Sequence, residues 1–181
     1  CLYEEGIDSD DIAYGIKELT QVSGRGQFCA KTIKGGKVYV DYAHTPEGLK
    51  KILFSMKNIS KGKVICLFGC GGNRDKSKRE IMGEVSGGCA DFTIITTDNP
   101  RFEDPMDIIR EIEEGVLKVT KKYVIVEDRA EGIRYAVSLA KKGDVILIAG
   151  KGAEKYQDVL GIKTPYNDKD TAIDILRESG R

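Results

Sequence analysis

Two arginines stand in short segments whose composition suits the binding of an anion. Arg74 directly follows the glycine-rich stretch 69–72, and Arg101 ends an Asp-Asn-Pro-Arg run. A guanidinium held by a tight turn grips a carboxylate or a phosphate through two parallel hydrogen bonds. A third segment, residues 150–154, combines two glycines with a lysine and Glu154. Arg74, Arg101 and Glu154 together suit a zwitterion with carboxylates and an ammonium group, which points towards an amino acid.

Each of these segments also has a simpler interpretation as a connection between elements. The spacing in 69–72 is neither GxGxxG nor GxxxxGK[ST], so it supports neither a dinucleotide fingerprint nor a phosphate-binding loop of that kind and fits a plain strand-to-helix turn. Asn-Pro pairs begin turns, and Pro105 opens the next helix at a preferred position. Lys76, Lys78 and Arg79 are predicted to lie on a solvated helix face.

His44 is the only histidine of the chain and follows a predicted strand that ends at Asp41. On spacing alone, a structural role is favoured over a catalytic one. Asp41 has the simpler role of capping the turn into the helix that Pro46 starts. Asp128 is predicted to be the N-cap of another helix, which accounts for residues 127–129 without a function.

The five cysteines form an odd set without a CxxC pair. This fits neither a disulfide framework nor a structural zinc site and favours a reducing cytosol. Cys66 lies in an apolar strand pattern, and Cys70 lies in the glycine-rich loop. Inert small residues are the favoured interpretation for both, and Cys70 keeps the alternative of a loop thiol that is acidified at a helix N-terminus.

Short apolar runs alternate with amphipathic segments along most of the chain, which predicts alternating strands and helices. The predicted strands cover 63–68, 91–96, 122–126 and 144–149, after a hairpin of 27–33 and 37–41. The predicted helices cover 8–19, 46–58, 77–88, 105–119, 129–141 and 168–179, the last capped by Asp168 or Asp170. We therefore expect an α/β fold with a Rossmann-like, mostly parallel sheet, helices on both faces and a preceding β-hairpin.

The segments that could do chemistry all follow predicted strands. In an open parallel sheet, ligands bind at the carboxyl ends of the strands. The loops after Asp41, Phe68, Thr97 and Ala149 are therefore expected to lie together along one edge of the sheet.

The composition limits the partners. With 29 basic and 29 acidic residues among 181, the formal net charge is zero, which argues against nucleic acid and against an acidic membrane surface. The longest apolar stretch, Val145 to Ala149, is far shorter than the ~20 residues that cross a bilayer. The first residues show no apolar segment of a signal peptide, and the chain does not begin with Met, so we expect a fragment.

Four ordered segments carry a resemblance to a known family. They are VDYAHTPEGLKKIL (40–53), FGCGGNRDKSKREIMG (68–83), TTDNPRFEDP (96–105) and IAGKGAEKYQ (148–157). Together they resemble the C-terminal domain of the Mur ligases, most closely that of the members that add meso-diaminopimelate. The resemblance implies that residues 23–181 are this domain and that residues 1–22 are a remnant of the last helix and linker of the family's central domain.

The resemblance implies a role in peptidoglycan precursor synthesis in the cytoplasm. In this family ATP phosphorylates the D-Glu carboxylate of UDP-MurNAc-L-Ala-D-Glu, and the amine of diaminopimelate attacks the acyl phosphate. The family's P-loop, Mg²⁺ ligands and carbamylated lysine belong to the central domain, and its UDP site belongs to the N-terminal domain. The 181 residues contain no GxxxxGK[ST]. We therefore expect a fragment that is inactive alone, without catalytic or metal-binding residues, that holds the amino acid and half of the nucleotide contacts.

Site residues follow from the same resemblance, position by position. The expected meso-diaminopimelate set is Arg74, Asp98, Asn99, Pro100, Arg101, Gly150 and Glu154. The residues expected to face ATP when the domains close are Arg25, Asp41 and His44. One departure is clear, because the family's last loop usually reads Gly-Lys-Gly-His-Glu and Ala153 stands where the histidine would be.

Three other interpretations remain open. The nearest is another Mur-type ligase, such as the lysine-adding enzyme or folylpolyglutamate synthetase. Arg101 argues against the lysine-adding enzyme, because lysine lacks the second carboxylate that this arginine would grip. A non-catalytic amino-acid-binding module would have a start codon near Cys1, whereas a ligase would continue upstream into a P-loop. A Rossmann oxidoreductase is the weakest alternative because the glycine fingerprint is missing.

Overall fold

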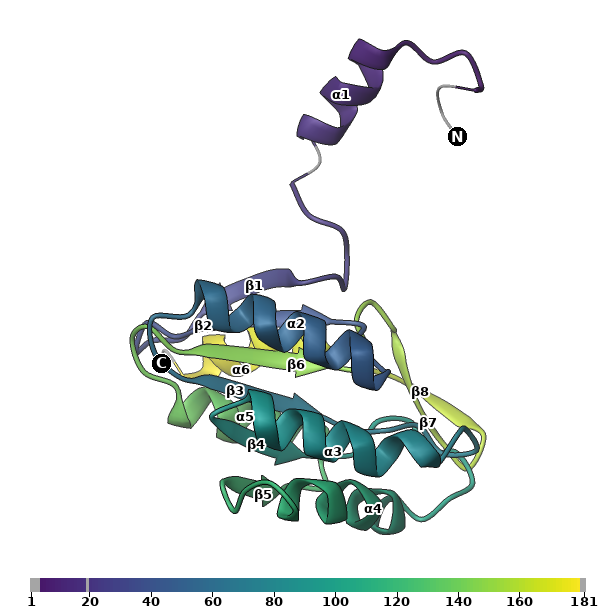
Figure 1. The fold of residues 1–181 in the computed structure, drawn as a ribbon, viewed down its shortest axis with the longest axis vertical. Coiled ribbons are helices and arrows are strands. Elements are labelled where there is room, and N and C mark those ends of the chain that lie inside the picture. The colour runs from purple at the N-terminus through teal and green to yellow at the C-terminus, as the bar shows by residue number, and fades with distance from the viewer. Residues whose placement is uncertain (1–3, 19, 180–181) are drawn as a thin grey trace.

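The computed structural model describes residues 4–18 and 20–179 and has an α/β fold (Figure 1). The helices are α1 (Ser9–Glu18), α2 (Pro46–Ile59), α3 (Ser77–Cys89), α4 (Pro105–Leu117), α5 (Arg129–Leu139) and α6 (Asp168–Ser179). The strands are β1 (Gln27–Lys31), β2 (Lys37–Asp41), β3 (Val64–Phe68), β4 (Phe92–Ile95), β5 (Tyr123–Ile125), β6 (Val145–Ala149), β7 (Tyr156–Val159) and β8 (Ile162–Pro165).

Six strands form one sheet in the order β1-β2-β6-β3-β4-β5, and β7 and β8 form a separate antiparallel hairpin. β1 runs antiparallel to β2, and the other neighbouring strands of the sheet are parallel. The prediction of a mostly parallel sheet that begins with a hairpin is confirmed. The structure adds that β2 lies directly beside β6, so the hairpin is joined to the parallel strands.

Both faces of the sheet are covered, which explains why its central strands are apolar throughout. All residues of β3 and β6 are buried, and successive side chains contribute to opposite faces. Helices α2, α3 and α4 pack on one face, and α5 and α6 pack on the other. Two apolar layers therefore hold the strand ends, and with them the loops, in fixed positions.

Side chains at the helix starts explain where the helices begin. Thr45 accepts a hydrogen bond from the Gly48 backbone N–H and caps α2, with Pro46 in its first turn. Asp128 caps α5, as predicted. Asp41 caps the turn that leads into α2, as predicted, because its Oδ1 accepts from the Ala43 N–H at 2.7 Å. The predicted cap of α6 is wrong, because α6 is capped by Asn167, whose side chain accepts from the Asp170 N–H.

The predicted element boundaries agree with the structure to within two residues, apart from the hairpin β7-β8, which the sequence analysis missed. Its strands are half-buried or exposed and lack an alternating apolar pattern. Its two turn residues, Leu160 and Gly161, both have positive φ, as a tight hairpin turn requires. Leucine is not typical of such a turn, so the sequence does not indicate it.

The N-terminal helix α1 stands away from the sheet in Figure 1, and none of its described residues is buried. Leu19, part of the predicted helix 8–19, lies outside the described residues. No helix within the described ranges has the length and apolar character to cross a membrane.

Candidate functional site

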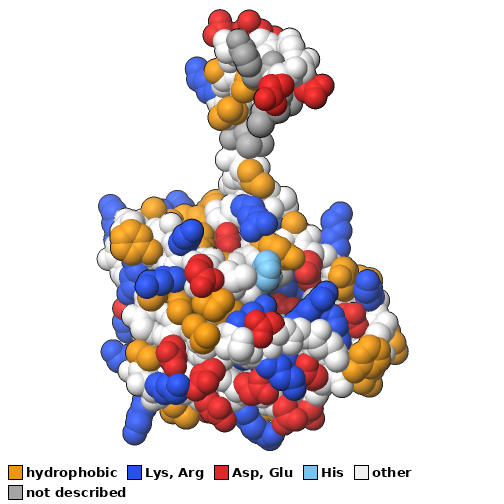
Figure 2. Space-filling view, turned by 45° about the vertical axis from the view of Figure 1, so that its right-hand side comes forward, with side chains coloured by type: hydrophobic (Ala, Val, Ile, Leu, Met, Phe, Trp, Pro, Cys, Tyr) orange, Lys and Arg blue, Asp and Glu red, His pale blue; other side chains and the backbone are white. Residues whose placement is uncertain are grey.

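A cleft of about 570 Å³ lies at the carboxyl ends of β2, β3, β4 and β6, where the predicted loops meet. Its volume is within the range of small-molecule sites. Figure 2 shows this edge of the molecule, where the histidine borders a surface of mixed basic and acidic side chains. The cleft is lined by seven of the predicted residues: His44, Arg74, Asp98, Asn99, Arg101, Gly150 and Glu154. The other three predicted residues, Arg25, Asp41 and Pro100, do not line it.

Arg101 is held in place through its backbone and its side chain. Its N–H donates to the Asp158 carbonyl (3.0 Å) and its carbonyl accepts from Leu160 (2.7 Å), so the β7-β8 hairpin fixes its main chain. Its φ of 52° is in the left-handed region, which costs a non-glycine residue on the order of 1–2 kcal/mol. Nη1 donates to the Gly72 carbonyl at 2.7 Å. The guanidinium thus enters the cleft from a strained and well-supported position.

Arg74 is exposed and lines the same cleft. The glycine loop before it lies against the loop of Arg101, because the Gly72 N–H donates to the Asn99 carbonyl at 2.9 Å. A Cβ on Gly72 would stand 1.9 Å from the Pro100 carbonyl oxygen, so only glycine allows this approach. Both predicted arginines therefore belong to one pair of closely packed loops.

Glu154 and Asn99 are tied together by a lysine that sequence analysis had placed only as a loop cation. Lys151 is fully buried, and its Nζ donates to Asn99 Oδ1 (2.8 Å) and Glu154 Oε2 (3.0 Å). Asn99 Nδ2 also donates to Glu154 Oε2 at 2.9 Å. A buried ammonium needs such partners. Lys151 and Asn99 thus orient the Glu154 carboxylate, which lines the cleft.

Asp98 and Gly150 form the floor next to this group. Burial raises the pKa of Asp98 above its ordinary value, against the opposing pull of Arg129 and Lys151. Gly150 has φ of 114°, and a Cβ there would lie 2.9 Å from Asp98 Oδ2. Gly150 therefore suits both the backbone conformation and the close approach of the carboxylate.

Arg129 supports the floor from inside the protein and was not predicted to have such a role. Its guanidinium is almost fully buried and pairs with Asp168 through Nε (2.7 Å) and Nη2 (2.9 Å). It also donates to the carbonyl of Thr97, two residues after the end of β4, and to that of Ala149, the last residue of β6. A buried cation with a partner on α6 thus connects the two loops that carry Asp98 and Gly150.

The three residues predicted to face a nucleotide surround Tyr42, a residue that the sequence analysis did not single out. Asp41 accepts hydrogen bonds from the N–H groups of Gly26 (2.6 Å) and Ala43 (2.7 Å). The Arg25 guanidinium lies 4.9 Å from the Tyr42 ring centre, and the His44 ring lies edge-on to that ring at 4.6 Å. His44 Nδ1 lies 2.9 Å from the Tyr42 carbonyl oxygen, to which it donates.

Two further expectations are settled by burial. Arg79 does not lie on a solvated face, because its side chain is fully buried among Glu103 and Glu111. Cys70 is buried with its Sγ 3.8 Å from Met82 Sδ, and burial raises the pKa of its thiol to about 12. The alternative of an acidified loop thiol at Cys70 is therefore wrong.

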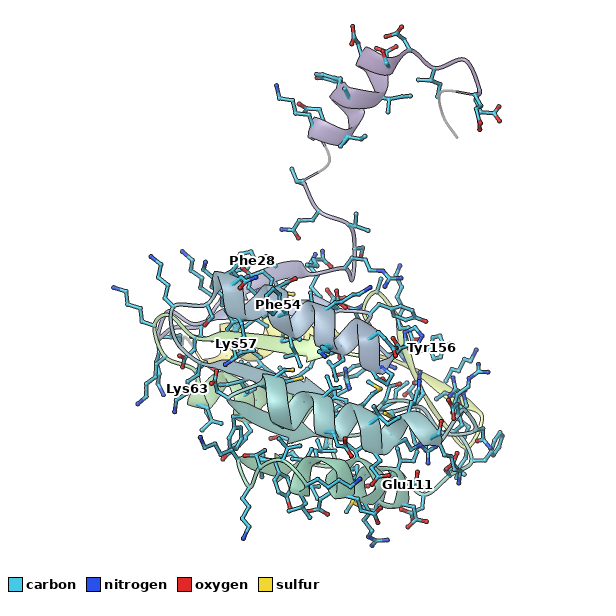
Figure 3. The ribbon with its side chains drawn as sticks, in the orientation of Figure 1. Phe28, Phe54, Lys57, Lys63, Glu111 and Tyr156 are labelled. Carbon is cyan, nitrogen blue, oxygen red and sulfur yellow. The ribbon has the colours of Figure 1, made fainter. Side chains whose placement is uncertain are left out.

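Tyr156, labelled in Figure 3, also lines the cleft and was not predicted.

Within residues 4–18 and 20–179, no cluster of three or more His, Cys, Asp or Glu side chains has the arrangement of a metal site. Basic and acidic side chains both line the cleft: Arg74, Lys78, Arg101, Asp75, Asp98 and Glu154.

Comparisons with known proteins show the family of the chain. A family model described as "Mur ligase, glutamate ligase domain" matches residues 24–152. The chain belongs to the Mur ligase family. A relative from Alkaliphilus metalliredigens, named UDP-N-acetylmuramoyl-L-alanyl-D-glutamate–2,6-diaminopimelate ligase, is 45% identical over 175 residues, which are 97% of this chain and 35% of the relative.

Other Mur ligases give the same picture. A relative of the same name from Caldanaerobacter subterraneus subsp. tengcongensis is 48% identical over 165 residues, 89% of this chain and 34% of its own. A solved structure of a ligase with that name has a TM-score of 0.83 and 31% identity, and the match covers 99% of this chain and 36% of that one. The chain thus spans about a third of the length of these Mur ligases.

Proposed function

We propose that residues 23–181 are the amino-acid-binding C-terminal domain of an ATP-dependent ligase that adds meso-diaminopimelate to UDP-MurNAc-L-Ala-D-Glu, and that residues 1–22 belong to the preceding domain. One observation carries the proposal. Two guanidinium groups, those of Arg74 and Arg101, line a single cleft together with the Glu154 carboxylate. Membership of the Mur ligase family and the names of the relatives agree with it.

The charges of the cleft complement those of diaminopimelate. Arg101 pairs with the carboxylate on the stereocentre distal to the attacking amine, and Arg74 strengthens the grip on carboxylate groups. Glu154 takes an ammonium group, while Asp98, Asn99, Pro100 and Gly150 shape the floor and wall. The remaining amine stays free. Its nitrogen forms the new amide bond with the D-Glu carbonyl carbon, and the bond from that carbon to phosphate breaks.

Arg25, Asp41 and His44 face the nucleotide in this proposal. ATP phosphorylates the acceptor carboxylate and Mg²⁺ accompanies its phosphates. The described residues offer no metal site, and the chain has no GxxxxGK[ST] sequence. We therefore assign the main ATP and Mg²⁺ contacts to parts of the longer protein outside this chain.

The proposal is tested with the full-length protein that contains this chain. Phosphate release is measured with ATP and UDP-MurNAc-L-Ala-D-Glu in the presence of meso-diaminopimelate, L-lysine or L-glutamate. Turnover with diaminopimelate, and little with the other two, is the expected result. Preference for lysine would instead support a lysine-adding ligase.

The 181-residue chain alone is expected to release phosphate only at the level of a blank preparation. Turnover above the blank would contradict the assignment of the ATP site to other parts of the protein. A gene that starts near Cys1, without upstream coding sequence, would support the non-catalytic binding module.

A further inference from the structure

A buried arginine joins the two loops that carry Arg74 and Arg101. Arg79, in the first turn of α3, donates from Nη1 and Nη2 to the two carboxylate oxygens of Glu103, each at 3.0 Å. Nη2 also donates to the Gly71 carbonyl, at 3.3 Å. The guanidinium thus contacts the glycine loop and the residue two positions after Arg101 at the same time. Two parallel bonds of this kind impose one geometry on both partners.

Glu103 completes the connection in the opposite direction. Its Oε1 accepts the backbone N–H of Asn73, the residue before Arg74. Asn73 Oδ1 in turn accepts the N–H of Phe102, the residue after Arg101, at 3.0 Å. The hydrogen bonds from Arg79 lower the pKa of Glu103 to about 2, so this carboxylate stays ionised. The two loops are therefore locked to each other just before Arg74 and just after Arg101.

The backbone at these positions needs such support. Asn73 has φ of 50° and Arg101 has φ of 52°, both in the left-handed region. Non-glycine residues hold this conformation only where surrounding contacts stabilise it. Neither Arg79 nor Glu103 lines the cleft, so any effect of these two on a ligand must pass through the loops.

We propose that Arg79 and Glu103 are positioning residues that set the separation of Arg74 and Arg101 and thereby the selectivity for an amino acid with two carboxylates. The inference rests on the proposed function for the identity of the ligand. The locking of the loops themselves does not depend on that identity. A small displacement of a guanidinium from the ligand carboxylate weakens binding strongly, because the two parallel hydrogen bonds require a strict geometry.

The chain offers a matched control in Glu111, which projects from α4 (Figure 3) and accepts a bond from Arg79 Nη1 at 2.9 Å. Glu111 is paired with the same arginine, and no hydrogen bond or ion pair joins it to the described residues of either loop. Glu103→Gln and Arg79→Lys are compared with Glu111→Gln in the full-length protein. We expect the first two to raise KM for meso-diaminopimelate at least about tenfold and to leave KM for ATP within about twofold. Glu111→Gln should leave both constants within about twofold.

Hydrogen exchange of the same variants without any ligand tests the locking of the loops separately from the proposed function. Faster exchange of the amides of residues 71–74 and 99–103 in Glu103→Gln, but not in Glu111→Gln, is expected. If wild type does not use diaminopimelate while exchange changes as expected, the proposed function fails and the locking of the loops stands. Equal exchange in the two variants, or an equal rise of both Michaelis constants in Glu103→Gln, would overturn the positioning role.

Discussion

The two sides of the cleft are built differently. On the side of Arg101 and Glu154, fully buried cations, Arg79 and Lys151, hold the loops from behind. On the side of His44, the side chains of His44 and of nearby Arg25 are exposed, and both contact the Tyr42 ring. The first side is preorganised by this domain alone. In the proposed function, the second side is completed by a neighbouring part of a longer protein.

This difference has an energetic consequence. Removing one partner of a buried ion pair costs about 3–5 kcal/mol, whereas exposed pairs contribute about 0–1 kcal/mol. Substitutions on the amino-acid side should therefore disturb both binding and folding. Substitutions on the nucleotide side should act on one substrate and leave stability almost unchanged.

The largest effect is expected from Gly72→Ala, because the new Cβ would stand 1.9 Å from the Pro100 carbonyl oxygen and force the two loops apart. We expect the free energy of unfolding to fall by about 3 kcal/mol, the upper part of the usual range for overpacking. Urea unfolding of the 181-residue chain measures it. The control is Gly88→Ala on α3, where the nearest atom is Val119 Cγ1 at 3.7 Å. Equal stability of the two variants would show that the loops are not closely packed.

Arg101→Ala should lower kcat/KM for meso-diaminopimelate at least about tenfold, since a charge-assisted hydrogen bond contributes about 1.5–3 kcal/mol. Use of L-lysine should change far less. Arg101→Lys should restore activity only in part, because an ammonium keeps the charge and loses the two parallel bonds. If the preference for diaminopimelate survives Arg101→Ala and is lost in Arg74→Ala, the selecting residue is Arg74.

His44→Ala should raise KM for ATP by about three- to tenfold, the effect of one hydrogen bond of ordinary strength, and change KM for diaminopimelate less. Steady-state kinetics of the full-length protein measures both constants, and the melting temperature should stay close to that of wild type because the His44 side chain is exposed. A larger effect on diaminopimelate would move His44 to the amino-acid side. No effect on either constant would restore a purely structural role.

The smallest effect is expected when the pH is changed above about 5. In that range the contribution of Glu103 to the free energy of unfolding should be constant. The pKa of Glu103 is lowered from 4.5 to about 2 by Arg79, so the folded state favours the ionised form. This contribution is fully present above the unfolded value of 4.5 and is lost as pH falls through about 2. The stability difference between wild type and Glu103→Gln, measured from pH 2 to 8, should shrink only below about 4.5. A difference that already falls between pH 8 and 5 would contradict the ion pair.

Much of the fold was predictable because it depends on local pattern. Uninterrupted apolar runs such as Val145 to Ala149 identify strands that are covered on both faces. Asp128 indicates the start of a helix, because aspartate is a preferred N-cap residue. The position of the loops at one edge follows from the parallel arrangement of the strands. The roles of Arg74, Arg101 and Glu154 came from residue type and family resemblance, and they stay predictions until tested.

Arg79 shows where local pattern fails. It follows Lys76 and Lys78 in a charged segment that resembles a solvated helix face, yet its partners Glu103 and Glu111 are 24 and 32 residues further along the chain. The bond from Lys151 to Asn99 and the contact of the β7-β8 hairpin with Arg101 were missed for a similar reason, because each joins segments far apart in the chain. The nearby sequence gives no sign of these two contacts.

The sequence by itself determined the succession of strands and helices along the chain and most of their boundaries, because periodicity and helix capping act over a few residues. It also determined the edge of the sheet at which the charged loops gather, because the strands run parallel. Only the tertiary structure decided which charges are buried and which carboxylate each buried cation meets. That choice depends on the order β2-β6-β3-β4, which brings together segments far apart in the chain. Desolvation then makes each buried charge depend on the partner that the fold places beside it.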